Sequence, residues 1–267
     1  MPGLMMQLCV GLCMLAPAMA QSRLLVTAVD ARTGRLIKDL RASDVVITDD
    51  KAHLTVVDLK PCGGPADVML LLDTGHDGSL VQPLAYELID EMRDPEQMAL
   101  VGYADSAELI VDFSASQERL KRALAKVRYA NEPKVLDALI AAISEGIDHA
   151  TYRRAILVLT AGYDSGRPTE LPAVVKLARE HRVSLFPIFV AATRRGLWED
   201  LARQTGGAAF NLKDMARDAS QTPAARIFEV ARSPYLVTIG GKASPSGKMK
   251  LEAKRSGKTF LSALPVE

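Results

Sequence analysis

Residues 67–79 read DVMLLLDTGHDGS, an apolar run that ends at the acidic residue Asp73. Every residue from Val68 to Leu72 is apolar, which is typical of a strand buried on both faces of a parallel sheet. A glycine-containing turn and a helical pattern follow the acid. Ligands of open α/β sheets bind beyond the carboxyl ends of the strands, so Asp73 is expected at the ligand edge.

Helical and extended patterns alternate along the chain after this strand. Segment 108–113 follows segment 98–103 too closely for a parallel crossover, so these two strands are expected to pair antiparallel. Strands are predicted at 98–103, 108–113, 155–160, 183–190 and 209–212, and helices at 80–92, 120–127, 135–147, 171–179 and 197–202. The alternation predicts an α/β fold with a doubly wound, mostly parallel sheet.

The two flanks of the chain have a different pattern, with short alternating strands separated by turn signals. The N-terminal segment, residues 21–60, is too short for a stable sheet of its own. We expect it to pack with the C-terminal β segment, residues 233–267, as one small β module. Residues 66–232 then form an inserted α/β domain, reached through the Pro/Gly-rich linker 61–65.

Residues 1–20 are uncharged, largely apolar and end in Ala-Met-Ala, which predicts a cleaved signal peptide. The alternative is an uncleaved membrane anchor. The expected location is therefore secreted, periplasmic or extracellular, with no transmembrane segment after signal removal. Cys62 is then the single cysteine of the mature chain, expected as a shielded thiol, with an intermolecular disulfide as the alternative.

Composition narrows the functional classes. The chain has 267 residues and a formal net charge of +1, so no basic face for nucleic acid is expected. The four histidines are scattered and lack the spacing of a zinc site.

Several segments, taken in order, resemble the von Willebrand factor type A (vWA) domain. They are DVMLLLDTGHDGS, MALVGYADSAELIVDFS, KVLDALIAAI, AILVLTAGYDS and LARQTGGAAFNL, and the resemblance covers about residues 66–212. The flanks are similar to the β segments around secreted vWA-related domains of acidobacteria. The resemblance implies a Rossmann-like fold and binding of a protein partner.

The resemblance also implies a metal-ion-dependent adhesion site, which this sequence matches only in part. Asp73 matches the first acid of the Asp-x-Ser-x-Ser loop, but the two serine positions hold Gly75 and Asp77. The threonine position falls on Pro133 and the last acid is replaced by Ala161. The site is therefore degenerate and expected to be without Mg²⁺ or Ca²⁺, unless Asp73 and Asp77 together rebuild it.

The preferred interpretation of this loop is that Asp73 and Asp77 are solvated acids and that Asp77 or Ser79 caps the following helix. Residues that can contact a partner at the same edge are Thr74, His76, Ser79 and Asp164.

The leading functional hypothesis is a non-enzymatic interaction or adhesion module that binds a protein or cell-envelope component through the loops at the carboxyl edge of the sheet. One alternative is a hydrolase or phosphotransferase that uses Asp73 with Asp77 or His76. A second alternative is a structural spacer in an envelope assembly. The sequence does not fix the oligomeric state.

Overall fold

The computed structural model describes residues 21–50, 52–130, 132–162, 170–190, 195–241, 249–255 and 257–266. The expected signal peptide at residues 1–20 and the candidate contact residue Asp164 lie outside the described residues. Within the described ranges, no helix has the length and apolar character needed to cross a bilayer.

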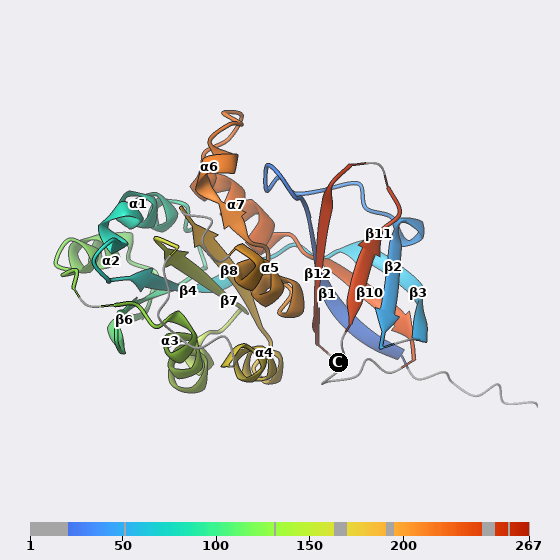
Figure 1. Cartoon of the computed structure of the whole chain (residues 1–267), viewed down its shortest axis with the longest axis horizontal. Helices are drawn as coiled ribbons and strands as arrows, with labels where there is room; N and C mark the ends of the chain where they lie inside the picture. The colour runs from blue at the N-terminus through green and yellow to red at the C-terminus, as the bar shows by residue number, and fades with distance from the viewer. Residues whose placement is uncertain are drawn as a thin grey trace, which may run out of the picture.

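The central part of the chain forms a six-stranded sheet in the order β6-β5-β4-β7-β8-β9 (Figure 1). β4 lies between β5 and β7 and is parallel to both. The edge strand β6 is antiparallel to β5, as its close spacing predicts. The strands are β4 (Ala66–Asp73), β5 (Met98–Tyr103), β6 (Ala107–Ser114), β7 (Arg153–Thr160), β8 (Val183–Phe189) and β9 (Phe210–Asn211). The predicted doubly wound, mostly parallel α/β sheet is confirmed.

Helices cover both faces of this sheet. Alternate residues of β4 therefore pack in two separate apolar cores, one on each face. Val68 and Leu70 pack in the core with α1, α2 and α7, whereas Met69 and Leu71 pack in the core with α3, α4 and α5. The helices are α1 (Gln82–Asp90), α2 (Gln117–Leu124), α3 (Val135–Ala141), α4 (Leu171–Glu180), α5 (Arg195–Gln204), α6 (Leu212–Met215) and α7 (Pro223–Arg232). All eight residues of β4 are buried, as the uninterrupted apolar run indicates.

Three of the predicted helices differ from the structure, and the helix expected at 120–127 lies three residues earlier, as α2. The helix expected at 135–147 is α-helical only to Ala141 and continues as a π turn (Ala142–Gly146) and a 3₁₀ turn (Ile147–His149). Ile143 in the π turn and Ile147 at the start of the 3₁₀ turn are both fully buried, as the apolar pattern of the segment indicates. The helix expected from residue 80 begins instead at Gln82, and Leu80 ends a short 3₁₀ helix, η2 (Gly78–Leu80), with its side chain exposed.

The two flanks of the chain form one second sheet, in the order β11-β2-β3-β10-β1-β12. Its strands are β1 (Gln21–Asp30), β2 (Val45–Asp49), β3 (Ala52–Pro61), β10 (Tyr235–Gly240), β11 (Lys250–Ala253) and β12 (Thr259–Pro265). β10 pairs with both β1 and β3, and β12 pairs with β1, so strands from the two ends of the chain are interleaved in the sheet. The sheet encloses its own apolar core, which includes Leu24, Ile47 and Val237. The expected β module from both flanks is therefore present.

Among the described residues, two of the contacts between the β module and the α/β part bring together segments far apart in the sequence. Gly206 and Gly207, which follow α5, accept hydrogen bonds from Thr27 of β1 and Ser262 of β12, at 2.7 and 2.5 Å. Gly206 has the left-handed φ of +73° expected of a residue after a helix end.

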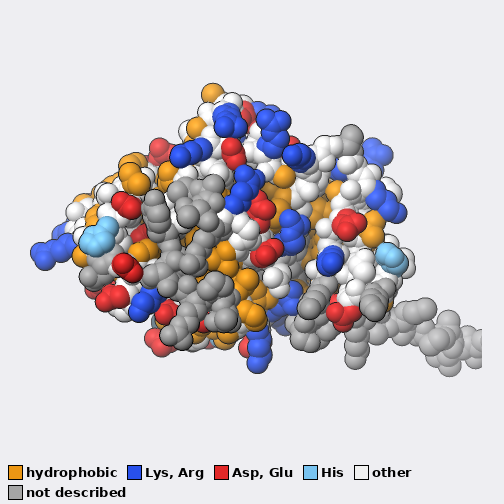
Figure 2. Space-filling view, in the orientation of Figure 1, with side chains coloured by type: hydrophobic (Ala, Val, Ile, Leu, Met, Phe, Trp, Pro, Cys, Tyr) orange, Lys and Arg blue, Asp and Glu red, His pale blue; other side chains and the backbone are white. Residues whose placement is uncertain are grey.

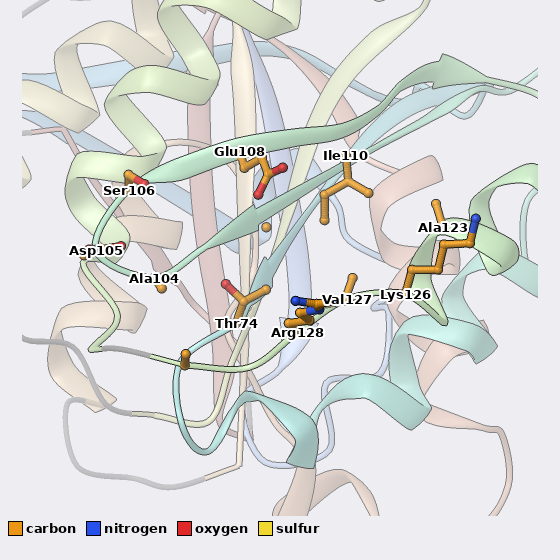
Figure 3. A pocket seen from close by; sticks show the side chains of 12 residues that line it. Thr74, Ala104, Asp105, Ser106, Glu108, Ile110, Ala123, Lys126, Val127 and Arg128 are labelled. Carbon is orange, nitrogen blue, oxygen red and sulfur yellow. The ribbon is translucent and has the colours of Figure 1, made fainter.

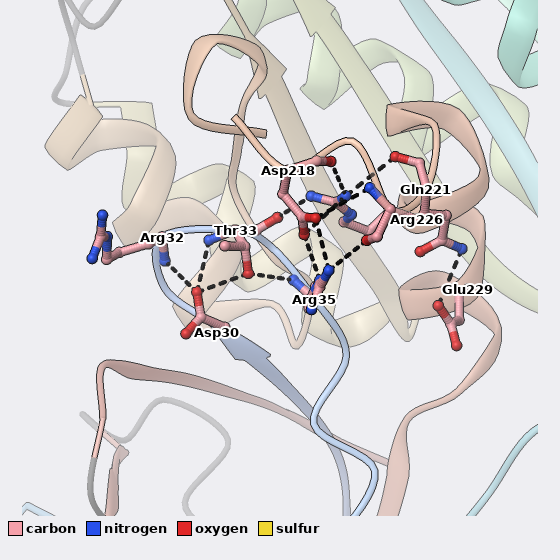
Figure 4. Close-up of polar contacts among 9 residues, drawn as sticks. Asp30, Arg32, Thr33, Arg35, Asp218, Gln221, Arg226 and Glu229 are labelled. Atoms are coloured by element: carbon pink, nitrogen blue, oxygen red, sulfur yellow. Dashed lines mark hydrogen bonds and ion pairs between the residues drawn. The ribbon is translucent and has the colours of Figure 1, made fainter. Parts of the chain in front are cut away.

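The second contact is built around a fully buried arginine on α7 (Figure 4). The Arg226 guanidinium donates to the Thr33 carbonyl in the turn after β1, at 2.6 Å, and to the Asp218 carbonyl at 2.9 Å. Arg35 pairs with the Asp218 carboxylate from the same turn. This pairing, helped by Ser220, lowers the pKa of Asp218 to about 2. The turn of the β module is thus held to the α/β part by charge-assisted hydrogen bonds.

Candidate functional site at the carboxyl edge of the sheet

Asp73 is the last residue of β4, and its carboxylate is bound by the protein's own donors. One oxygen accepts from the Gly75 amide at 2.8 Å. The other accepts from the Ala161 amide at 3.1 Å and from the Thr160 hydroxyl at 3.4 Å, both at the end of β7. The side chain is only 1 % exposed. Asp73 therefore joins the ends of two adjacent strands, and the expectation that it is a solvated loop acid is wrong.

The pKa of Asp73 is raised above its ordinary value. Burial is the main cause, because it removes water from the charged form, and the nearby charge of Asp77 adds to it. The Ala161, Gly75 and Thr160 donors oppose this rise, since each stabilises the carboxylate.

The loop that follows Asp73 turns back tightly on the strand end. A Cβ on Gly78 would lie 2.1 Å from the Asp73 carbonyl oxygen, so only glycine fits at this position. As a result, the side chains of His76, Asp77, Ser79 and Leu80 are exposed, and that of Thr74 is half-buried. Leu80 is 62 % exposed, the largest value among the exposed large apolar residues of the described chain.

The predicted helix cap is absent. Asp77 occupies the N-cap position of η2, but its side chain makes no capping hydrogen bond. Ser79 lies inside η2, and the N-cap position of α1 is Val81, which has no side-chain donor or acceptor. The turn begins instead with a backbone hydrogen bond from Gly78 to Gly75, at 3.0 Å.

The segment between α2 and α3 crosses above the ends of β4 and β5. The Ala130 amide donates to the Thr74 carbonyl, and the Lys134 amide donates to the Ala104 carbonyl, each at 2.9 Å. The ring of Tyr129 lies close to Gly78, and its hydroxyl is buried without a partner among the described residues. Burial, together with Tyr86 and Asp73, raises the pKa of Tyr129 to about 12.

These residues do not fit a divalent cation. Both oxygens of Asp73 already accept hydrogen bonds from the chain, and Gly75, Ala161 and Pro133 offer no side-chain oxygen at the other positions of the adhesion site. Asp77 is exposed, and no cluster of three or more His, Cys, Asp or Glu side chains suited to a metal occurs in the described ranges. Asp164 lies outside those ranges.

A pocket of about 380 Å³ opens beside this loop (Figure 3). Its walls are the end of β5, the edge strand β6 and the segment after α2, and Thr74 lies at its centre. The lining residues are Thr74, Gly102, Ala104, Asp105, Ser106, Glu108, Ile110, Ala123, Lys126, Val127, Arg128 and Ala130. Of the residues singled out from the sequence, only Thr74 reaches this pocket.

Thr160 and Tyr129 are the site residues that the sequence pattern did not reveal. Thr160 ends an apolar strand and reads as part of it, and its contact with Asp73 depends on the parallel pairing of β4 with β7. Tyr129 lies in a segment without periodicity.

No protein-family model and no curated protein sequence matches the chain. Solved structures do match. An aerotolerance-related membrane protein from Bacteroides fragilis has a TM-score of 0.53 and 14 % identity, over 62 % of this chain and 98 % of that one. A von Willebrand factor type A protein from Catenulispora acidiphila has a TM-score of 0.53 and 11 % identity, over 94 % of this chain and 74 % of that one.

Proximal thread matrix protein 1 from the mussel byssus, with a zinc-occupied metal-ion-dependent adhesion site, is also similar. Its TM-score is 0.53 at 18 % identity, over 74 % of this chain and 50 % of that one, so this chain spans half of the mussel protein. At these identities the likeness concerns the fold. The chain has the fold of a von Willebrand factor type A domain.

Proposed function

We propose that this chain is a secreted, non-enzymatic interaction module that binds a protein or another cell-envelope component through the loops at the carboxyl edge of its vWA-type sheet. One observation carries the proposal. Asp73 is bound and covered by the chain itself, whereas the loop after it exposes Leu80 beside His76 and Asp77. Protein interfaces combine an apolar centre with a polar rim, and this loop offers side chains of both kinds.

The same geometry favours binding without a metal. In a metal-ion-dependent site the cation bridges the domain and a carboxylate of the partner. Here the amides of Gly75 and Ala161 take up the oxygens of the one matching acid, so recognition is left to the side chains around it.

The enzyme alternative is less well supported by the geometry. A catalytic carboxylate must touch its substrate, and Asp73 is only 1 % exposed. His76 is exposed and forms no hydrogen bond within the described residues, so nothing holds it as a base.

The proposed location outside the cytoplasm rests on residues 1–20, with their apolar run and Ala-Met-Ala ending. Figure 2 shows acidic and basic side chains interspersed over one face of the molecule, which suits a protein partner better than nucleic acid.

The test uses the mature chain from Gln21 as bait in a native envelope fraction, with cross-linking and mass spectrometry. The double variant His76→Ser/Leu80→Ser should lose the captured component. Val57→Ser, which changes an exposed apolar residue of the β module, should retain it. Capture should be equal in Mg²⁺, Ca²⁺ and a chelator.

Three outcomes contradict the proposal. Equal capture by both variants would place the contact elsewhere, and failure to capture any component in repeated trials would favour the spacer. Hydrolysis of phosphoesters or esters that Asp73→Ala abolishes would favour the enzyme.

A further inference from the structure

We propose that the pocket between β6 and the segment after α2 binds an extended peptide of a partner protein with acidic, apolar and basic residues in succession. This inference rests on the proposed function and deepens it, because it names the chemistry of the partner and the place of contact.

The pocket carries charges of both signs on facing walls. Asp105 and Glu108 come from the β5–β6 hairpin, whereas Lys126 and Arg128 come from the segment after α2 (Figure 3). All four side chains are exposed, and none forms an ion pair or hydrogen bond with the described residues. These side chains are therefore available to charged groups of a ligand, one acidic and one basic.

The part of the pocket between these walls is apolar and of limited size. Ile110, Val127 and Gly102 contribute to its lining, and Thr74 adds a single hydroxyl. A volume of about 380 Å³ is at the lower end of the range for small-ligand sites, which is roughly 300–1,000 Å³. Two side chains fill such a space, but a folded domain does not enter it.

The edge of the sheet explains why the ligand is a peptide. Within the described part of the chain, β6 pairs only with β5, so its other side is available for backbone hydrogen bonds. An extended peptide can add to such an edge as a further strand, with side-chain pockets supplying specificity. Glu108 and Ile110 of β6 both line the pocket, which places it directly beside this edge.

The place of the apolar residue between the two charged residues follows from strand geometry, and the titration below decides which charged residue comes first. In an extended peptide, alternate side chains point to the same face and lie about 7 Å apart, while the middle one points to the other face. The outer two residues face the pocket, and the middle residue faces the side of Leu109. Leu109 is 54 % exposed on an edge strand, where a charged residue is the usual protection against pairing. An apolar middle residue covers it.

The test titrates the ¹⁵N-labelled mature chain with two capped peptides, Ac-Gly-Glu-Leu-Lys-Gly-NH₂ and Ac-Gly-Lys-Leu-Glu-Gly-NH₂. We expect one order to bind at least threefold more tightly, with the largest amide shifts at Gly102, Ser106 and Ile110. Glu108→Gln and Arg128→Gln should each weaken that binding tenfold or more. The double swap Glu108→Arg/Arg128→Glu leaves one charge of each sign on each wall, because Asp105 and Lys126 remain, and should abolish the preference between the two peptides.

The matched controls are Glu118→Gln and Arg122→Gln, which remove exposed charges of α2 outside the pocket and should leave binding unchanged. A peptide with Gln at both charged positions should not bind.

No binding at 10 mM peptide, shifts away from the pocket, or equal binding by the Glu108 and control variants would overturn the inference. The envelope capture separates the two proposals. Capture that depends on His76 and Leu80 but survives Glu108→Gln and Arg128→Gln would retain the proposed function and reject this pocket.

Discussion

A single residue, Asp73, decides how the carboxyl edge of this sheet is built. Its carboxylate accepts the amides of Gly75 and Ala161 and so replaces, with internal hydrogen bonds, the ligand contacts expected from the family resemblance. A buried acceptor of this kind stabilises the ends of β4 and β7, because the two amides have no water to bind in its absence.

Asp73→Ala should therefore destabilise the fold. Each buried amide left without an acceptor costs about 1–3 kcal/mol, so we expect the free energy of unfolding to fall by about 2–4 kcal/mol, partly offset by removal of a buried charge. Urea unfolding followed by the fluorescence of the buried Trp198 measures this loss.

The control is Asp77→Ala, since Asp77 is exposed and caps nothing. It should change the free energy of unfolding by no more than about 0.5 kcal/mol. Two results would contradict the conclusion that the Asp73 carboxylate serves the chain's own amides. One is an equal loss of unfolding free energy in both variants. The other is a urea midpoint that rises with Mg²⁺ in the wild type but not in Asp73→Ala.

At the scale of elements, the turn after α5 is the most demanding junction between the two sheets. A Cβ on Gly206 would lie 2.6 Å from the Cβ of Leu264, and the residue has a φ of +73°. Gly206→Ala should lower the free energy of unfolding by about 2–5 kcal/mol, from left-handed strain and overpacking together.

The same substitution on α5 itself provides the comparison. A Cβ on Gly196 meets nothing within 4 Å, and Gly196→Ala should be neutral or stabilise by up to about 1 kcal/mol, because alanine favours the helix. Thermal unfolding of both variants decides the point. Similar midpoints would show that the turn relaxes and that the two sheets are not tightly joined there.

The elements that the sequence predicts well are those with a strong period. The apolar runs of β4, β5 and β7 predict these strands, and the close spacing of β6 predicts its antiparallel pairing with β5, whereas the order of the strands in the sheet comes from the structure. α7 has no place in the sequence prediction, although Thr222 and Pro223 are a strong start signal and the Thr222 hydroxyl does cap the helix at Ala225.

The candidate site is less predictable because its contacts join distant segments. Asp73 is recognisable as the end of a buried strand, but its partners at Ala161 and Thr160 come from another strand, about 87 residues further on. Leu80 continues the helical period and yet is exposed, because the turn at Gly78 begins a 3₁₀ helix rather than α1. The periodicity of a local stretch of sequence does not show that a turn interrupts the helix there.

At the scale of the whole molecule, the α/β part is inserted into the β module, and the two connections run side by side. The Cys62 amide donates to the Pro234 carbonyl, and the Gly64 amide donates to the Arg232 carbonyl. Cys62 itself is half-buried. A buried acid, Glu96, links the two connections. Its carboxylate accepts a hydrogen bond from the Ala66 amide at the start of the α/β part, at 3.3 Å, and from the Arg232 guanidinium at its end, at 2.5 and 2.7 Å.

Glu96→Gln should show how much the contact between Glu96 and Arg232 contributes to the free energy of unfolding, and how this contribution depends on pH. Burial raises the pKa of Glu96, but the hydrogen bonds from Arg232 and from the Arg93 amide outweigh it, so the pKa lies below the ordinary 4.5. The stabilisation is therefore complete above pH 4.5 and is lost as the pH falls from 4.5 through the lowered value. Breaking a buried pair costs about 3–5 kcal/mol, so the variant should be less stable by that amount at pH 7.

Urea unfolding at pH 7.0, 4.5 and 3.5 measures the difference between wild type and Glu96→Gln, which should narrow as the pH falls. Glu118→Gln, which removes an exposed pair with Arg122, should cost no more than about 0.5 kcal/mol at any of these values. If the difference in free energy of unfolding between wild type and Glu96→Gln does not change with pH, the packing of the Glu96 side chain, and not its charge, stabilises the two connections. A difference that narrows would show that the ion pair between Glu96 and Arg232 stabilises the junction between the inserted part and the β module.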